Sequence, residues 1–435
     1  MDFKKIENRN ICILGWGIEN QALVKFLLKN KIDCQITVCD ARKSVGTSRG
    51  LSSVQRKLGK NYDKNLNAYD IIFRSPGYPL FEKNIIQAKK SGVEISSPME
   101  LFFNFCPTKN IIGVTGTKGK GTTSSLIFEI LKLGGKKIFL GGNIGVAPFT
   151  FIDKIKKNDW VVLELSSFQL EDLNINPKIV VITNFYKEHL APADPNNPNF
   201  HKSFKKYWEA KVNIFKRQEK GNILIVNKKL KNKIKKLKLR NKTIYFNKSE
   251  LPSKLVGEYN KENIAASVEA AKIIGVKENI IKKAIANFKG LEHRLELVKK
   301  VKGVEYYDDS FATTPEATIL ALKSFSSPIV ALLGGADKGS DFSKLTKIVK
   351  QKVKFVVLLK GQATLKIQNL LIKDGYSKEE MKIVSNIKEA MRQVGRKIVN
   401  GDIVLLSTAC ASFGMFKNYK ERGNLFKQEV KKLKK

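Results

Sequence analysis

Residues 110–123 read NIIGVTGTKGKGTT and lead into the run SSLIFEILKL over 124–133. The first part is an apolar strand pattern, the middle is a glycine-rich turn, and the end has apolar residues at helical spacing. Glycines let backbone N–H groups turn toward an anion, a helix N-terminus adds partial positive charge, and Lys120 can reach the β- and γ-phosphates of a nucleotide. The stretch therefore predicts a strand, a phosphate-binding loop and a helix in an α/β domain that binds a nucleoside triphosphate.

This loop departs from the strict P-loop pattern at two positions. Val114 stands where the first glycine is expected, and Gly121 stands where a serine or threonine would bind magnesium. We expect Thr122 or Thr123 to supply that hydroxyl; on this motif alone, a glycine-rich turn without a ligand is the alternative. The predicted ATP contacts of the loop are Gly116, Thr117, Lys118, Gly119, Lys120, Gly121, Thr122 and Thr123.

The whole chain of 435 residues is long enough for two to four domains, because single cores rarely exceed about 250–300 residues. Apolar strand runs alternate with amphipathic stretches in three blocks, which is the pattern of parallel α/β sheets. We predict a Rossmann-like N-terminal domain over 1–97, a central P-loop ATPase-like domain with a parallel sheet over 98–290, and a Rossmann-like C-terminal domain over 291–435. The expected strand runs lie near 10–17, 35–41, 69–77, 110–116, 160–168, 178–185, 222–227, 304–310, 328–335, 353–361 and 402–409.

A net charge of +40, from 80 Lys and Arg against 40 Asp and Glu, is typical of proteins that bind nucleic acid or anionic membranes. The lysines are spread along the whole chain, however, and a positive field also suits polyanionic substrates. The densest run, 228–242, places Leu230, Ile234 and Leu237 at helical spacing and contains no aromatic residue. This favours a solvated amphipathic helix over a nucleic-acid patch, so we expect no nucleic-acid partner.

Neither export nor membrane insertion is expected. The apolar runs are far shorter than the ~20 residues that span a bilayer, and the first residues lack an apolar segment with a cleavage site. Five cysteines form no CxxC pair and mostly lie in apolar runs, as reduced thiols do, which fits the cytoplasm. Five cysteines and three histidines in these positions predict no zinc cluster.

Further motifs follow the phosphate loop in a fixed order and carry a family resemblance. They are GGNIG (141–145), LELSSFQL (163–170), Asn184 with Glu188 and His189, YWEAK (207–211), GEYNKEN (257–263), GLEHRLE (290–296), DDSFATTPEA (308–317), LLGGADKGSDF (332–342) and LLSTACASFGMFKNYKERGNLF (405–426). Together they make nearly the whole chain similar to the Mur ligases. The resemblance implies a monomeric, ATP-dependent, amide-forming ligase of peptidoglycan precursor synthesis, and is strongest to members that add D-glutamate to UDP-N-acetylmuramoyl-L-alanine through an acyl-phosphate.

The resemblance also implies roles for residues of the central site. Lys120, Glu164, His189 and Lys211 match the family's catalytic residues, and Thr122, Glu164, His189 and Lys211 match positions that hold two magnesium ions. Lys211 matches a lysine that carbon dioxide converts to a carbamate. Glu188 is one methylene longer than the usual aspartate, a change that should be tolerated. For ATP, Asn260 and Asn263 match an adenine-contacting pair, Arg294 a triphosphate contact and Asp309 a ribose contact.

The resemblance implies that the first block binds the UDP portion of the substrate. A glycine turn follows the first strand, and Asp40 closes the next strand about 20 residues on, a pattern of dinucleotide folds. The third glycine of the fingerprint is Asn20, so NAD is the weaker alternative to UDP. The predicted contacts of the UDP-linked substrate are Gly15, Trp16, Gly17, Asp40, Arg42, Ser75, Pro76, Gly77, Asn143, Ser166 and Gln169.

The amino-acid end of the site agrees with the family pattern only in part. Lys338, Ser412, Phe413 and Tyr419 lie at matching positions, whereas Phe311 replaces a lysine expected near a carboxylate. Either Thr313, Thr314 or another lysine compensates, or the amino acid differs. A folylpolyglutamate synthase, a Mur ligase for another amino acid, a basic P-loop ATPase acting on nucleic acid, and a non-catalytic NAD-binding sensor are the alternative functions.

Overall fold

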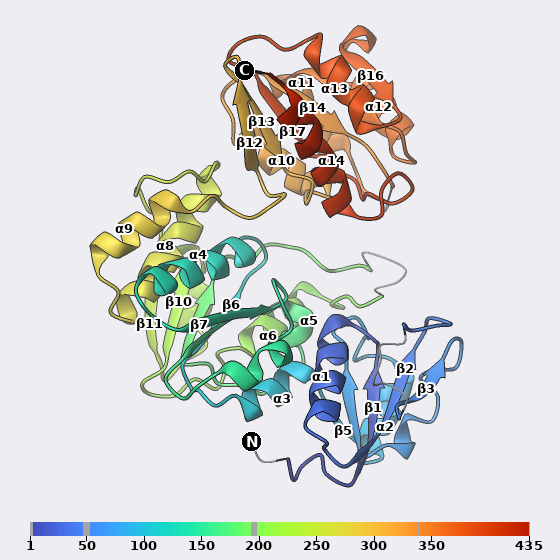
Figure 1. The fold of residues 1–435 in the computed structure, drawn as a ribbon, viewed down its shortest axis with the longest axis vertical. Coiled ribbons are helices and arrows are strands. Elements are labelled where there is room, and N and C mark those ends of the chain that lie inside the picture. The colour runs from blue at the N-terminus through green and yellow to red at the C-terminus, as the bar shows by residue number, and fades with distance from the viewer. Residues whose placement is uncertain (1–2, 47–52, 193–197, 338, 435) are drawn as a thin grey trace. The chain divides into compact units, whose positions relative to one another are not determined.

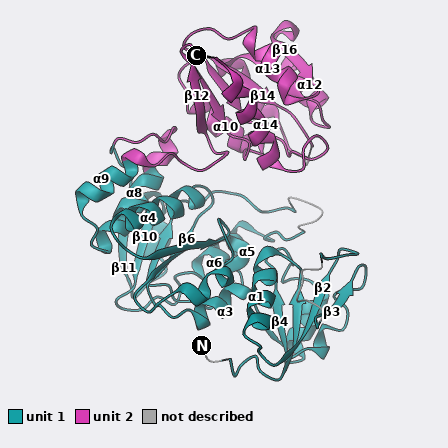
Figure 2. Ribbon diagram, viewed as in Figure 1, with its two compact units in different colours: residues 1–251, 262–285 teal, residues 252–261, 286–435 magenta. Residues whose placement is uncertain are grey.

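The computed structural model describes residues 3–46, 53–192, 198–337 and 339–434. The chain folds into two compact units, one formed by residues 1–251 and 262–285 and the other by residues 252–261 and 286–435 (Figure 2). The first unit holds two sheets and the second holds one (Figure 1). The α/β class that the alternating strand and helix patterns predict is confirmed.

The N-terminal sheet is parallel, with strand order β3-β2-β1-β4-β5. Alternate residues of β1 enter two different apolar clusters, Ile11 and Ile13 on one face and Cys12 and Leu14 on the other, so both faces are covered. The elements are β1 (Arg9–Leu14), α1 (Ile18–Lys29), β2 (Cys34–Asp40), β3 (Gln55–Leu58), β4 (Ile71–Arg74), α2 (Lys83–Lys90), β5 (Glu94–Ser96) and α3 (Pro98–Phe105).

The central sheet is also parallel, with order β11-β10-β9-β6-β8-β7. All five residues of β6 are buried, because it lies between β9 and β8 inside the sheet. The elements are β6 (Ile111–Thr115), α4 (Lys120–Leu133), β7 (Ile138–Gly142), β8 (Trp160–Glu164), α5 (Ser167–Leu170), β9 (Ile179–Ile182), α6 (Phe204–Val212), β10 (Ile223–Asn227), α7 (Lys231–Lys235), β11 (Lys242–Phe246), α8 (Glu258–Ile273) and α9 (Glu278–Asn287). The strand, loop and helix predicted over 110–133 are thereby confirmed.

The C-terminal sheet has order β12-β13-β17-β14-β15-β16 and is mixed. Five of its strands pair in parallel, as the predicted Rossmann-like domain requires, whereas β12, which was not predicted, runs antiparallel to β13. Lys302 and Gly303 join these strands with φ of 49° and 76°, the left-handed two-residue turn that only a hairpin uses. The elements are β12 (Glu296–Val301), β13 (Val304–Asp308), α10 (Pro315–Lys323), β14 (Ile329–Leu333), α11 (Ser343–Lys352), β15 (Val353–Leu359), α12 (Thr364–Lys373), β16 (Met381–Val384), α13 (Ile387–Gly395), β17 (Ile403–Leu406) and α14 (Tyr419–Lys432).

The lysine-rich run 228–242 is helical only in its first half. A short 3-10 turn over 228–230 and α7 bury Leu230 and Ile234, while Leu237 is partly buried. Lys238 then adopts a left-handed φ of 46°, which ends the helical path before β11. The predicted amphipathic face is therefore real but shorter than the sequence pattern suggests.

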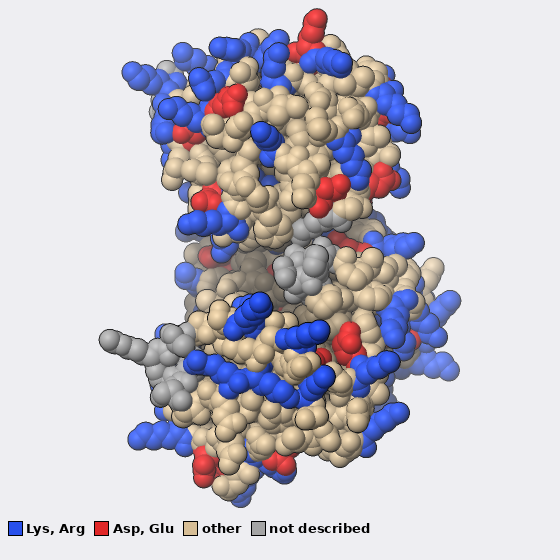
Figure 3. Space-filling model, turned by 90° about the vertical axis from the view of Figure 1, so that its right-hand side faces the viewer, with Lys and Arg blue, Asp and Glu red and all other residues tan. Residues whose placement is uncertain are grey.

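Basic side chains are spread over the visible face in Figure 3, between uncharged residues that make up most of it, and the acidic side chains are fewer. On that face the basic side chains do not gather into one stripe, which agrees with their even spread along the sequence. All five cysteines are free thiols, four of them buried. Among the described residues, no helix combines the length and the apolar character needed to cross a bilayer.

Candidate active site

The phosphate loop is held open by two glycines and pinned by the segment after β9. Gly116 and Gly119 have φ of 146° and 81°, and a Cβ at either position would overlap the side chain of Thr183 or Asn263. Asn184 accepts from the loop twice, with its backbone oxygen 3.1 Å from Thr117 N and its Oδ1 2.8 Å from Lys118 N. The loop conformation is thus set before any nucleotide binds.

Lys120 begins α4 and folds back over this loop. Its ammonium donates to the carbonyl oxygens of Gly116 and Thr117, at 3.1 and 3.0 Å. Two loop carbonyl oxygens therefore hold this cation at a helix N-terminus, which itself favours anions. This is the arrangement that a triphosphate requires.

The two threonines after Gly121 differ in their surroundings. Thr123 is fully buried, and its hydroxyl lies 3.4 Å from Asn263 Oδ1. Thr122 is only half-buried. Because a magnesium ligand must face the nucleotide rather than the helix interior, exposure favours Thr122 as the hydroxyl that Gly121 lacks.

Glu164 lies at the end of β8, beside the loop. Asn143 donates to its Oε1 at 2.7 Å, while its Oε2 is buried without a hydrogen-bond partner among the described residues. An unpartnered buried carboxylate oxygen is costly unless a cation lies next to it. The donor chemistry at Glu164 therefore fits a divalent cation.

Lys211 on α6 is buried directly behind the loop. Its ammonium donates to Gly116 O at 2.8 Å and to Thr115 Oγ1 at 3.4 Å, neither of which carries a charge. Burial, reinforced by the nearby Lys120, holds the pKa of Lys211 well below its usual value. A lysine here is therefore disposed toward the neutral amine.

His189 and Glu188 follow β9 on a third side of the loop. Burial lowers the pKa of His189 to about 4, so the ring is neutral at pH 7 and able to bind a metal. Its backbone φ of 59° is left-handed, and its ring packs edge-on against Phe168 and Tyr207. Glu188 accepts from Lys118 Nζ at 2.5 Å. Burial opposes ionisation of Glu188, but Lys118 outweighs it and lowers the pKa.

These side chains meet because β6, β8 and β9 are neighbouring parallel strands whose carboxyl ends share one edge of the sheet. The charges of Lys120, Glu188 and Glu164 all act on Lys211, and those of Lys118, Lys120 and Lys211 act on His189. The structure therefore brings the four predicted catalytic residues together. Tyr207, whose hydroxyl lies 3.0 Å from Thr117 Oγ1, joins them and was not predicted.

The predicted UDP residues of the N-terminal domain form a second cluster, at the carboxyl ends of β1, β2 and β4, whereas Asn143 lies against Glu164 in the central cluster. Trp16 N donates to Asp40 Oδ2 at 2.6 Å, and Arg42 donates to both Asp40 oxygens. Gly15 has a φ of 86°, and a Cβ there would lie 2.8 Å from Ser75 Cβ. Asn20 occupies the third glycine position and donates to Gly15 O at 2.7 Å, so its side chain closes the turn.

The predicted UDP contacts Ser166 and Gln169 belong to the central domain, which lies in the same unit. Ser166 and Gln169 form a capping box at the start of α5, and Gln169 Nε2 also donates to Glu19 Oε1 at 2.6 Å. Burial raises the pKa of Glu19 to about 7. Arg74 donates to both oxygens of Asp172, each at 2.9 Å. Glu19, Arg74 and Asp172 were missed because nothing in their local sequence marks them.

The remaining candidates, apart from Asn263, lie in the second unit. Asp309 is buried between Ser407 Oγ and Leu295 N, which donate to its two oxygens at 2.7 and 3.2 Å. Burial raises its pKa to about 7. Arg294 lies with its guanidinium carbon 3.7 Å from the centroid of the Phe311 ring. Asn260 and Asn263 lie on α8 as predicted, and Asn260 Nδ2 donates to Val256 O at 2.7 Å.

Ser412 is buried, Phe413 is exposed, and Tyr419 begins α14 with its ring edge-on to Phe311. Lys338 lies outside the described residues. Arg422, for which no role was predicted, is fully buried and donates to Ser310 Oγ, Ser310 O and Cys410 O. It therefore holds together the two segments on which the amino-acid candidates lie.

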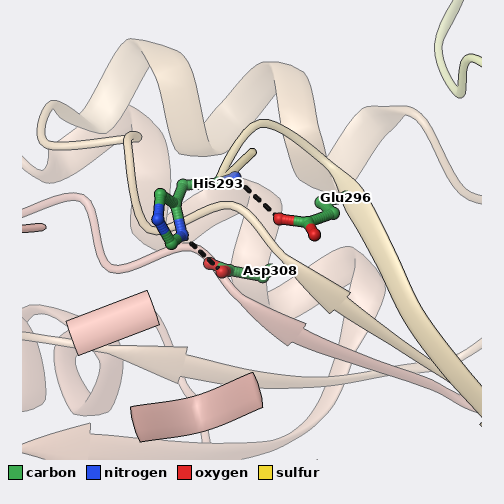
Figure 4. A group of neighbouring side chains, drawn as sticks. All are labelled: His293, Glu296 and Asp308. Atoms are coloured by element: carbon green, nitrogen blue, oxygen red, sulfur yellow. Dashed lines mark hydrogen bonds and ion pairs between the residues drawn. The ribbon is translucent and has the colours of Figure 1, made fainter. Parts of the chain in front are cut away.

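Figure 4 shows His293, Glu296 and Asp308, whose ligand atoms all lie within 4.8 Å of one another. His293 Nδ1 is 2.7 Å from Asp308 Oδ2, and His293 N donates to Glu296 Oε2 at 2.9 Å. Lys427 already places its ammonium 3.1 Å from the same Glu296 oxygen. Hydrogen bonds within the cluster and the Lys427 ammonium already occupy these atoms. We therefore interpret the cluster as a support for the turn that carries Arg294.

Three family profiles match the chain. They are the MurD-like N-terminal domain of Mur ligases over residues 9–97, the Mur ligase middle domain over 114–251, and the Mur ligase glutamate ligase domain over 293–410. Relatives named UDP-N-acetylmuramoylalanine–D-glutamate ligase are 36% identical in Acetivibrio thermocellus, covering 99% of this chain and 98% of the relative, and 35% identical in Clostridium tetani, covering 99% of both.

The chain belongs to the Mur ligase family.

The fold of this Mur ligase also matches solved structures of the family. A MurF ligase from Thermotoga maritima in complex with ADP superposes with a TM-score of 0.59 at 18% identity, covering 99% of this chain and 97% of that one. The family membership that the ordered motifs predict is thus confirmed. Tyr207 and Arg422 of this Mur ligase lie within the quoted motifs, but no role was predicted for them, and their contacts come from the structure.

Proposed function

We propose that the chain is an ATP-dependent ligase that joins the amine of D-glutamate to the carboxylate of UDP-N-acetylmuramoyl-L-alanine, with release of ADP and phosphate. The observation that carries this proposal is the match, over 99% of the chain, to relatives named for this reaction. The central cluster supports the phosphoryl chemistry, because it places a loop lysine, an unpartnered carboxylate oxygen and a neutral imidazole beside one helix N-terminus.

In the first step, the substrate carboxylate attacks the γ-phosphate, forming an acyl-phosphate and releasing ADP. Lys120 and the loop N–H groups hold the triphosphate and stabilise the charge that develops on it. In the second step, the neutral amine of D-glutamate attacks the acyl carbon, and phosphate leaves with the bonding electrons of the broken C–O bond. Catalysis then depends mainly on positioning and charge stabilisation.

The residues present fit the magnesium ions that such a reaction needs. Glu164, His189 and the hydroxyl of Thr122 would hold them. When bound, the ions would neutralise the triphosphate charge. Glu164 offers the unpartnered buried oxygen and His189 the neutral ring, so both donors are in the state that metal binding requires.

Lys211 completes this arrangement if its amine combines with carbon dioxide. A neutral lysine amine and CO₂ give a carbamate and a proton, which replaces a buried cation with an anion at the same place. The lowered pKa of Lys211 and its two uncharged hydrogen-bond partners support this modification. A carbonyl signal from bound ¹³CO₂ in NMR, absent in Lys211→Ala, would test it directly.

The proposal includes a monomer working in the cytoplasm, where ATP and UDP-linked precursors are found and where the five free thiols stay reduced. Light scattering of the purified chain tests the monomer. The adenine contacts of Asn260 and Asn263, the UDP contacts at Gly15, Asp40 and Ser75, and the amino-acid contacts at Ser412 and Tyr419 are parts of the same proposal.

The deciding experiment measures phosphate release from ATP in the presence of UDP-N-acetylmuramoyl-L-alanine and a panel of D- and L-amino acids. We expect D-glutamate to stimulate release and the ligated product to appear by mass spectrometry. Stimulation by L-lysine or diaminopimelate instead would overturn the amino-acid assignment alone. Stimulation by nucleic acid and by no amino acid would overturn the whole proposal.

A further inference from the structure

Arg294 lies at the centre of a turn whose backbone is unusual. Its neighbours His293 and Leu295 both adopt left-handed conformations, with φ of 63° and 42°. Side-chain-bearing residues rarely adopt this region, so the surrounding contacts must hold the turn in place. Glu296 Oε2 accepts from His293 N, and Asp309 Oδ1 accepts from Leu295 N. The direction in which Arg294 leaves the backbone is therefore fixed from both sides.

Phe311 forms a platform under the Arg294 side chain. The guanidinium carbon lies 3.7 Å from the ring centroid, which is a close cation–π contact. The Phe311 side chain is 39% exposed, so this ring is not part of the apolar core. A large aromatic ring held at the surface against an arginine needs an explanation other than core packing.

The ring itself is held from behind and through its backbone. Tyr419 packs edge-on against Phe311, with ring centroids 5.0 Å apart and planes at 87°. Phe311 N donates to His293 O at 3.0 Å, which ties the platform to the arginine turn. Arg422 fixes the preceding residue, Ser310, through both its hydroxyl and its carbonyl oxygen. Platform and guanidinium are thus parts of one rigid arrangement.

A guanidinium that stacks by its face keeps its N–H donors in its own plane, where they can bind an oxyanion bidentately. An aliphatic residue at position 311 would supply packing but no ring quadrupole, and a lysine there would repel Arg294. The aromatic ring therefore gives Arg294 both packing and a cation–π attraction, which neither an aliphatic residue nor a lysine could provide.

We propose that Phe311 is a positioning residue that orients Arg294, backed by Tyr419, toward the phosphate oxygens of ATP. The choice of ATP as the anion rests on the function proposed above. The Phe311 ring carries no charge and no hydrogen-bond donor for an amino-acid carboxylate. Its effect is expected on nucleotide binding, through Arg294.

The test compares Phe311→Leu and Phe311→Trp in the full chain. Binding of the ATP analogue AMP-PNP with magnesium is measured by calorimetry, and KM values for ATP and D-glutamate by phosphate release. Loss of an exposed cation–π contact predicts about 2- to 5-fold weaker AMP-PNP binding and a matching rise in KM for ATP in Phe311→Leu. Phe311→Trp should restore both to within about twofold, because indole also stacks on arginine. The KM for D-glutamate and the melting temperature should change little in either variant.

A double-mutant cycle with Arg294→Gln separates positioning from general packing. Once the guanidinium is removed, Phe311→Leu should have almost no further effect on AMP-PNP binding. Simple addition of the two effects, or a change confined to the KM for D-glutamate, would overturn the proposal. If the unaltered protein binds AMP-PNP but ligates no amino acid, the proposed function fails while this binding test of Phe311 still decides its role.

Discussion

Lys211 Nζ donates a 2.8 Å hydrogen bond to the carbonyl oxygen of Gly116, which places a buried amine directly behind the phosphate loop. The contact joins the last turn of α6 to the residue that follows β6. A charged lysine in this position has no compensating carboxylate hydrogen bond among its described contacts, and burial together with Lys120 lowers its pKa. The loop therefore has behind it an amine whose charge state can change.

Lys211→Ala should reduce ligase turnover by at least about 100-fold, because the proposed carbamate would be lost from the metal site. The measurement is phosphate release with saturating substrates. Added acetate or formate should restore part of the activity, since a small carboxylate can occupy the vacated space. Full activity in Lys211→Ala would contradict a role for this amine. Lys216→Ala, an exposed lysine four residues beyond α6, is the matched control.

Glu164→Gln should separate activity from stability. Removal of a buried carboxylate oxygen without a partner should leave the melting temperature unchanged or raise it in the absence of magnesium, whereas turnover should fall about 100-fold or more. Calorimetry and phosphate release measure the two effects. Asp159→Asn is the control, because Asp159 precedes β8 at the opposite end of the strand. A stability loss in Glu164→Gln without magnesium would mean that the carboxylate is a structural group.

Thr122→Ala should lower turnover and raise about 10-fold the magnesium concentration that gives half-maximal turnover. Thr122→Ser should retain most of the activity, because serine keeps the hydroxyl. Titration of turnover against magnesium concentration measures this. Thr123→Val, which removes the hydroxyl at similar volume, should leave the magnesium dependence unaltered, since the Thr123 hydroxyl faces Asn263 inside the helix packing. The reverse pattern would assign the metal hydroxyl to Thr123.

Glu19 predicts a pH dependence of stability in the first unit. Its folded pKa of about 7 lies above the usual value of 4.5, so the folded state binds the proton more tightly than the unfolded state. Its contribution is therefore fully present below about pH 4.5 and is lost as pH rises toward 7, by an amount on the order of 3 kcal/mol.

Glu19→Gln should flatten this dependence between pH 5 and pH 7, because glutamine keeps a hydrogen-bonding side chain next to Gln169 without titrating. Urea unfolding of both proteins across that range measures the difference. Asp309 also has a raised pKa and adds a similar slope from the second unit, so the comparison concerns the change on substitution. An identical slope in both proteins would show that Glu19 remains ionised when folded.

The local parts of this molecule were predictable from the sequence. The strand, loop and helix around Lys120 follow from apolar periodicity and from glycines at positions that need positive φ. The six strands β3, β5, β7, β11, β12 and β16 were not predicted. Three of them have three or four residues, and all six are edge strands with weak apolar patterning.

The sequence by itself determined the class of fold, the phosphate loop and the family, because these depend on short-range spacing and on the order of motifs along the chain. Only the tertiary structure decided that Gln169 meets Glu19, 150 residues away, that Thr122 rather than Thr123 faces outward, and that Phe311 lies under Arg294. Such pairings depend on how strands and helices pack, and burial rather than sequence spacing sets the charge state of Lys211. The residue types determine which chemistry is possible, and the packing determines which groups lie close enough together to perform it.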